Sequence, residues 1–149
     1  MSLTLESEGG HMANLVSAQA PTLPTPDDAK DEFYNQLDQI ISRTPCKHKL
    51  IMMGDFNAQV GCDHHQAWEK VIGRHGIGKE NSNITPLLSL CTAHKLMITN
   101  TMFKQRDSHK VSWMHPRSRH WHLLDYVIVR QRYCRRQPDT VTAWLNLLV

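Results

Sequence analysis

The segment LIMMGDFNAQVG, from Leu50 to Gly61, joins four apolar residues directly to a short polar run. Gly54 would let the backbone leave a strand without a side-chain clash. Asp55 and Asn57 are two positions apart, so in extended backbone their side chains point to one side. A carboxylate can hold or deprotonate a water, and an amide can donate to a phosphoryl oxygen. The same residues favour an Asx turn after a strand, and on residue type alone that structural interpretation is favoured.

A second carboxylate, Asp125, interrupts the apolar run at 123–129. Such a group is costly inside a strand unless it is paired, and a histidine or an arginine would be its natural partner. The alternative is that Asp125 faces the open side of a sheet and is simply solvated. Because Asp125 departs more strongly from its neighbours than Asp55 does, we expect it to belong to a functional site.

The segment 113–122 interleaves aromatic side chains with arginines and histidines, a composition that suits stacking on bases and contact with phosphates. Its candidate substrate contacts are Trp113, Arg117, Arg119 and His120. A tryptophan in such a place is more often a core residue, so the structural interpretation of Trp113 stays open.

Two groups contain metal-ligating residue types. They are His120 with His122, and Cys62 with His64 and His65. Neither group has the spacing of a paired zinc site, so zinc is not expected and the metal ligands are unassigned.

The chain has 149 residues, enough for one compact domain with a hydrophobic core. Its formal net charge is only +3, but basic residues gather in the second half. They are Lys104, Arg106, Lys110, Arg117, Arg119, Arg130, Arg132, Arg135 and Arg136. This distribution is compatible with a polyanionic partner and also with an ordinary solvated surface.

The cysteines indicate a reducing compartment. Cys46, Cys62, Cys91 and Cys134 form no Cys-x-x-Cys pair, so we expect free thiols. No apolar run approaches the length of a membrane span, and the N-terminus lacks a signal-peptide pattern. We therefore expect an intracellular protein, nuclear or cytoplasmic, with no membrane partner.

Strands and helices alternate along the chain. Strands are expected at 12–19, 49–53, 96–99, 111–114 and 123–129, and a long polar loop at 61–79. A helix is expected to start at Pro26, with Thr25 as its N-cap and Asp28 as the reciprocal acid, and to end by Thr44. A second helix is expected to start near Thr85. This order predicts an α/β fold.

Four segments, in this order, resemble the endonuclease/exonuclease/phosphatase superfamily, which contains DNase I and the apurinic-site endonucleases. The segments are LIMMGDFNAQVG, RHGIGKEN, LLSLCTAHKLMITNTMF and VSWMHPRSRHWHLLDYVIV. Within the superfamily, the likeness is to endonuclease domains of LINE-type retrotransposons and to vertebrate genes derived from them. It covers about residues 13–129 and implies a partial DNase I-like α/β sandwich, with mixed sheets flanked by helices.

The resemblance implies a Mg²⁺-dependent phosphodiesterase acting on nucleic acid, with DNA the foremost substrate. By that likeness, Asp55 would activate the attacking water and Asn57 would bind the scissile phosphate. Asp125 would support a catalytic histidine near the C-terminus. Trp113 and the segment 117–122 would approach the nucleic-acid backbone.

The chain departs from the family pattern at both ends. An asparagine and a glutamate that set the metal site have no counterpart before Leu15, and Gln19 stands where a phosphate-binding tyrosine is usual. The ending AWLNLLV lacks the family's histidine motif. We therefore expect a single, incomplete domain over 1–149, with divergent ends at 1–12 and 139–149.

Two functions are compatible with this pattern. One is a Mg²⁺-dependent endonuclease, and the other is a catalytically inactive, retroelement-derived remnant that binds nucleic acid or protein. Missing strands would leave a sheet face uncovered, which would favour self-association through that face.

Overall fold

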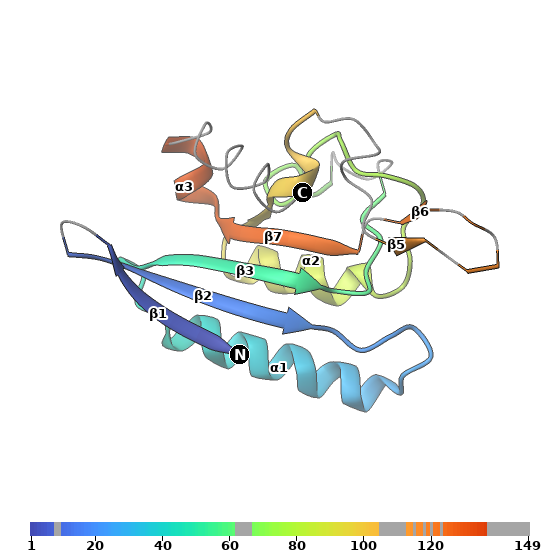
Figure 1. Ribbon diagram of the computed structural model, residues 1–149, viewed down its shortest axis with the longest axis horizontal. Helices are drawn as coiled ribbons and strands as arrows, with labels where there is room; N and C mark the ends of the chain where they lie inside the picture. Colours follow the sequence, from blue (N-terminus) through green and yellow to red (C-terminus); the bar gives the residue numbers. More distant parts are fainter. Residues whose placement is uncertain are drawn as a thin grey trace.

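The computed structural model describes residues 1–7, 10–61, 67–104, 113–114, 116–117, 119, 121–122 and 124–136. In this part, five strands form a mixed sheet in the order β1-β2-β3-β7-β4. Their bounds are β1 Ser2–Ser7, β2 His11–Gln19, β3 Lys49–Asp55, β4 Leu96–Ile98 and β7 Asp125–Arg130. The helices α1 (Asp27–Arg43) and α2 (Ile84–Ala93) cover one face of this sheet (Figure 1). The predicted α/β class is confirmed.

Shorter elements complete the described part. The 3₁₀ helix η1 (Thr99–Thr101) follows β4, and α3 (Gln131–Arg136) follows β7. The strands β5 (Trp113–Met114) and β6 (Trp121–His122) pair with each other as a small separate sheet.

The strand β3 lies in the middle of the sheet. It runs parallel to β2 and antiparallel to β7, while β1 pairs antiparallel with β2 and β4 with β7. A parallel pair needs a long crossover, and α1 supplies the one between β2 and β3. The sequence did not predict β1, which pairs with β2 along its whole length.

Both faces of β3 are buried. Leu50 and Met52 are fully buried and belong to the main core, together with Leu37 of α1. Ile51 points to the opposite face, where it packs with Val127 and Val129 of β7. The unbroken apolar run therefore marks a strand covered on both sides, as predicted.

Exposure on the sheet face away from the helices is concentrated on β1. Leu3 and Leu5 are 53% and 45% exposed, whereas Ile51 and Val127 retain 8% and 6%. The expectation of an uncovered sheet face is therefore wrong for β3 and β7 and holds only for β1. Self-association through this face stays a prediction.

The predicted capping box of the first helix is wrong. Pro26 occupies the N-cap position, and no side chain caps the helix. The hydroxyl of Thr25 instead hydrogen-bonds to that of Thr22 at 3.2 Å. The end of the helix at Thr44 is as predicted, and the Thr44 hydroxyl donates to the carbonyl oxygen of Ile40 at 2.9 Å.

Gly54 permits a close approach of two strands. It lies inside β3 with φ of +142°, opposite Ala18 of β2 and Tyr126 of β7. A Cβ atom at this position would lie 1.9 Å from the carbonyl oxygen of Ala18. The expected role of Gly54 is thus corrected: the strand continues to Asp55, and the glycine makes room for β2.

We expect Gly54→Ala to lower the free energy of unfolding by about 3 kcal/mol or more, because a methyl group meets backbone that is fixed by strand pairing. The matched control is Gly78→Ala, at φ of +75° with no atom within 4 Å of the new Cβ. It should cost about 1 kcal/mol, from backbone strain alone. Urea unfolding of both variants measures the difference, and equal losses would refute the steric explanation.

Candidate functional site

Three strand ends meet at one end of the sheet, where β2 and β3 finish and β7 begins. Asp55, the last residue of β3, pairs with Gln19 of β2 and with Asp125 of β7. Opposite residues of an antiparallel pair point to the same face, with Cβ atoms about 4.5–5.5 Å apart. Since Met53 and Val127 lie on the face away from the helices, alternation puts both carboxylates on that face. The structure therefore brings Asp55 and Asp125 together, and we call them the acid pair.

The chain turns sharply after the acid pair. The backbone N–H of Asn57 donates to Oδ1 of Asp55 at 2.8 Å, and Asn57 has φ of +47°. This hydrogen bond closes an Asx turn, which is the structural alternative that the sequence suggested for Asp55. The Asn57 side chain donates from Nδ2 to the carbonyl oxygen of Ala20 at 2.8 Å. Phe56 is fully buried and anchors the turn in the core, as expected for a residue pointing away from Asp55.

Two asparagines that the sequence analysis did not select hold this turn from the side. The carbonyl oxygen of Asn57 accepts hydrogen bonds from Nδ2 of Asn81 at 3.2 Å and of Asn83 at 3.0 Å. Asn81 also accepts the backbone N–H of Gln59 at 3.1 Å. Asn83 is the N-cap of α2, so that helix begins before the predicted Thr85. The sequence did contain a signal for these two residues: they lie in a polar run directly before an apolar helix, where the first backbone N–H groups need partners.

A buried tyrosine supports the turn from behind. The Tyr126 hydroxyl donates to the carbonyl oxygen of Ala58 at 2.8 Å and accepts the N–H of Val60 at 3.3 Å. Tyr126 follows Asp125 in β7 and points to the helix-covered face, where it is 1% exposed. One strand thus supplies a carboxylate on one face and the anchor of the loop on the other.

The free edge of β7 beside the acid pair is closed by a side chain. Asn100 of η1 accepts the N–H of Val127 at 2.8 Å and donates to the carbonyl oxygen of Asp125 at 3.4 Å. Since β4 has already ended at Ile98, Asn100 takes the place of a neighbouring strand. Asn100 is the third asparagine that the sequence analysis missed.

The surroundings of Asp55 oppose its ionisation. Partial burial raises the pKa of Asp55, the hydrogen bond from Asn57 lowers it, and the nearby Asp125 carboxylate raises it. The two raising effects prevail. The pair is therefore an electrostatically strained site that a cation would stabilise.

Comparison with known proteins identifies the fold. No protein-family model matches the chain. Over 119 residues, 80% of this chain, it is 33% identical to craniofacial development protein 2 of Bos taurus and 32% identical to that of Tragulus javanicus. It spans about a fifth of the length of these curated relatives.

A solved structure of an endonuclease/exonuclease/phosphatase family protein from Leptotrichia buccalis C-1013-b superposes with a TM-score of 0.50 and 18% identity. The match covers 86% of this chain and 40% of that one. The chain therefore has the fold of this endonuclease/exonuclease/phosphatase family protein. The resemblance inferred from the sequence motifs is confirmed, and so is the partial DNase I-like sandwich.

Superfamily members are generally metal-dependent, and the acid pair suits a hard divalent cation. Mg²⁺ prefers oxygen ligands and often takes only one or two carboxylates from the protein. Asp55 and Asp125 provide two carboxylates on one face of the sheet, and a cation between them would offset their repulsion. Within the described ranges, no three His, Cys, Asp or Glu side chains gather as a metal-binding group. Cys62, His64, His65 and His120 lie outside those ranges.

The predicted substrate contacts belong to the β5–β6 hairpin. Trp113 pairs with His122 through the backbone, and Arg117 and Arg119 are exposed in the connection between the two strands. Arg119 has φ of +53°. His120 lies outside the described residues. Figure 1 places the hairpin at the end of the long axis where β3 ends and β7 begins, which is the end that carries the acid pair.

The cysteines that the structure describes are free thiols, as predicted. Cys46 is free and exposed, and Cys91 is free and buried, so burial raises the pKa of the Cys91 thiol well above its usual range. Cys62 lies outside the described residues, as does the side chain of Cys134. In the part of the chain that the structure describes, no helix has the length and apolar character needed to span a membrane.

We expect Tyr126→Phe to lower the free energy of unfolding by about 1–3 kcal/mol, because it leaves the Ala58 carbonyl and the Val60 N–H without their buried partner. Tyr133→Phe is the control. Its hydroxyl donates to the Lys47 carbonyl in an exposed setting, where water replaces it, so the change should stay within about 0.5 kcal/mol. Urea unfolding tests both, and a neutral Tyr126→Phe would contradict the anchoring role.

We expect Asp55→Asn to be more stable than the parent protein at neutral pH. Because the folded-state pKa of Asp55 is raised, the folded chain binds this proton more tightly than the unfolded chain does. The resulting stabilisation is lost as pH rises through the folded pKa, whereas asparagine never ionises and keeps the Oδ1 acceptor. Below the unfolded value near 3.8 the advantage should disappear.

Thermal melting in EDTA at several pH values measures this effect. The control Asp28→Asn removes an exposed acid from the first turn of α1, where a negative charge favours the helix, so it should lower stability instead. A loss of stability in Asp55→Asn at neutral pH would refute the electrostatic strain.

Proposed function

We propose that this chain carries the phosphodiesterase centre of a Mg²⁺-dependent endonuclease that hydrolyses nucleic acid, with DNA as its foremost substrate. The observation that carries the proposal is the acid pair, with Asn57 at the same strand end. A carboxylate whose pKa is raised, a second carboxylate and an amide donor are groups that can support phosphodiester hydrolysis by water.

Asp55 is the proposed base. Its Oδ1 is held by the Asn57 N–H, which fixes the orientation of the carboxylate and leaves Oδ2 to accept a proton from the attacking water. A raised pKa brings the group closer to the pH at which a general base works well. The water oxygen then forms the new bond to phosphorus as the bond to the leaving oxygen breaks.

Asn57 and Asp125 complete the proposed centre. An amide has two N–H donors, and Asn57 uses one toward Ala20, so the second remains for a phosphoryl oxygen. Asp125 would offer its carboxylate to Mg²⁺ beside that base. When bound, the metal stabilises negative charge that builds on the phosphate oxygens.

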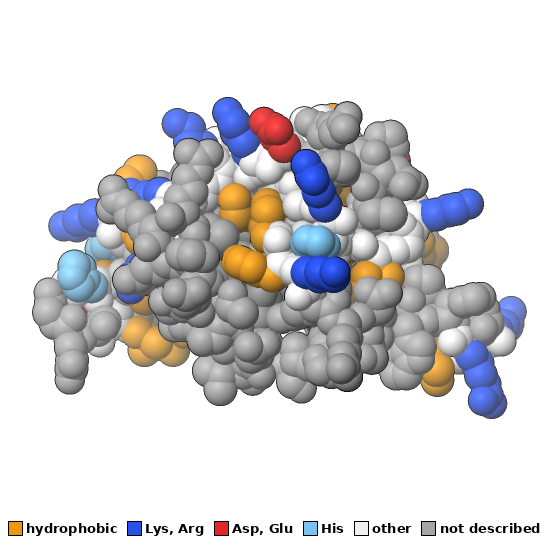
Figure 2. Space-filling model, turned by 90° about the horizontal axis from the view of Figure 1, so that it is seen from above, with side chains coloured by type: hydrophobic (Ala, Val, Ile, Leu, Met, Phe, Trp, Pro, Cys, Tyr) orange, Lys and Arg blue, Asp and Glu red, His pale blue; other side chains and the backbone are white. Residues whose placement is uncertain are grey.

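Charge supports a polyanionic substrate. Arg117 and Arg119 are exposed on the hairpin at the acid-pair end, and the chain as a whole carries a formal charge of +3. Figure 2 shows the molecule from above the view of Figure 1. On the face seen there, basic side chains outnumber acidic ones among the coloured residues. Trp113 and His120 complete the proposed substrate contacts.

The second candidate is a binding module derived from a retroelement that no longer cleaves. The observation that favours it is the hydrogen bond from the Asn57 amide to Ala20, which turns a proposed phosphate ligand toward the protein. Gln19, paired with Asp55, also stands where the family carries a phosphate-binding tyrosine. Under either proposal we place the protein inside the cell, in nucleus or cytoplasm.

Nicking of supercoiled plasmid by the purified chain tests the proposal. We expect Mg²⁺-dependent nicking that EDTA abolishes and that falls at least about 100-fold in Asp55→Ala and Asp125→Ala. Asp28→Ala, an exposed acid of α1, should nick like the parent chain.

The other outcomes are equally informative. Nicking that survives Asp55→Ala identifies a contaminating nuclease and contradicts the proposal. An absence of nicking, with DNA binding that weakens as salt rises, supports the binding module instead.

A further inference from the structure

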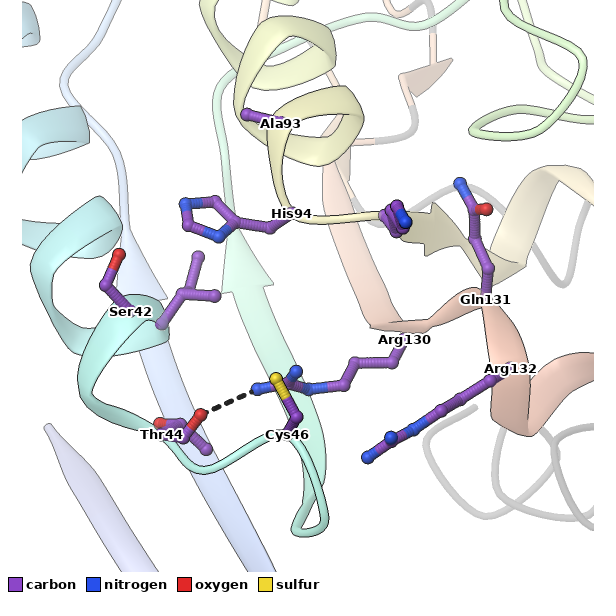
Figure 3. Close-up of a pocket in the computed structure, with 10 residues that line it drawn as sticks. Ser42, Thr44, Cys46, Ala93, His94, Arg130, Gln131 and Arg132 are labelled. Carbon is purple, nitrogen blue, oxygen red and sulfur yellow. Dashed lines mark hydrogen bonds between the residues drawn. The ribbon is translucent and has the colours of Figure 1, made fainter.

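A basic cavity lies at the end of the sheet opposite the acid pair. It has a volume of about 630 Å³ and opens between the C-terminal ends of α1 and α2 and the end of β7 (Figure 3). Its polar and charged lining includes Thr44, Cys46, Lys95, Arg130, Gln131 and Arg132. None of the lining residues in the described part of the chain is a carboxylate, so the lining does not favour a cation.

Arg130 is the innermost cation of this lining. Its Nη2 donates to the carbonyl oxygen of Thr44 at 3.0 Å, the bond drawn in Figure 3. Its Nε is buried and, in the described part of the chain, has no hydrogen-bond partner. Folded proteins rarely leave such donors unpaired. A turn of the guanidinium toward the cavity would offer Nε and a terminal nitrogen together, the two-pronged geometry that arginine uses for phosphate.

Two further cations stand at the exposed rim. Arg132 donates to the Tyr133 hydroxyl at 2.8 Å, and its guanidinium lies 4.8 Å from the centre of that ring, which limits its motion. Lys95 is exposed at φ of +52°, directly after the end of α2. Both side chains line the cavity beside Arg130: Lys95 from the connection between α2 and β4, and Arg132 from α3.

The balance of charge favours an anion. The C-terminal ends of α1 and α2 contribute about half a negative charge each, and salt screens these partial charges. Against them stand three full positive charges, on Lys95, Arg130 and Arg132. Asp38 lies outside the lining and is bonded to His94 at 2.6 Å.

We propose that this cavity binds a phosphate group through Lys95, Arg130 and Arg132. The phosphate belongs either to inorganic phosphate and small phosphate esters or to a nucleic-acid backbone. Asp125 and Arg130 begin and end the six residues of β7, which puts the two sites about 17 Å apart. The cavity is therefore separate from the acid pair, and its occupancy does not depend on the proposed hydrolysis.

Calorimetric titration of the full 149-residue chain with inorganic phosphate, at fixed ionic strength, tests the site. Lys95→Gln and Arg132→Gln should each weaken phosphate binding about three- to fivefold, as expected for exposed charged contacts. The double variant should weaken it about tenfold or more. Lys70→Gln removes an exposed lysine outside the lining and should leave phosphate binding unchanged.

A fluorescent single-stranded oligonucleotide separates the two sources of phosphate. If Lys95→Gln weakens oligonucleotide binding and inorganic phosphate competes with it, the ligand is the nucleic-acid backbone. If only inorganic phosphate responds to Lys95→Gln, the ligand is free phosphate or a small phosphate ester. Absence of phosphate binding at millimolar concentration, or equal weakening by Lys95→Gln and Lys70→Gln, overturns the proposal.

Discussion

The pairing of β3 with strands on both sides is the constraint on which the rest of the structure depends. It is possible only because Gly54 has no side chain at the point where the carbonyl oxygen of Ala18 comes close. The same pairing aligns Asp55 with Gln19 on one side and with Asp125 on the other. A slip of one residue would turn every side chain of β3 to the opposite face and would separate the two acids.

The acid pair is costly for the fold, and the surrounding hydrogen bonds keep it in place. Partial burial weakens the ionised form of Asp55, and repulsion from Asp125 adds to this effect. Against this, the turn that carries Asn57 is fixed by Asn81 and Asn83, and the loop behind it by Tyr126. Energetic strain of this kind, held by a rigid shell, is typical of sites where function conflicts with stability.

The two ends of the sheet carry opposite chemistry. At one end β7 begins with Asp125 beside Asp55, and at the other it ends with Arg130 between two helix ends. Arg130 has a structural task, since it binds the carbonyl of Thr44 after α1. The cations Lys95 and Arg132 line the cavity beside it, and their charges exceed the partial charges of the two helix ends, which is the basis of the proposed phosphate site.

The sequence by itself determined the central strands, the two long helices and the candidate acids. The apolar runs before Asp55 and around Asp125 are local patterns, and hydrophobic burial makes them strands directly. The superfamily motifs placed Asp55, Asn57 and Asp125 in one candidate site before any geometry was known.

Only the tertiary structure decided the register, the role of Gly54 and the shell of asparagines. The shell consists of Asn81, Asn83 and Asn100. Their side chains form hydrogen bonds to backbone groups that are 22 to 27 residues away in the sequence. No local pattern encodes such partners. The basic cavity has the same origin, since the ends of α1, α2 and β7 converge only when distant parts of the chain pack together.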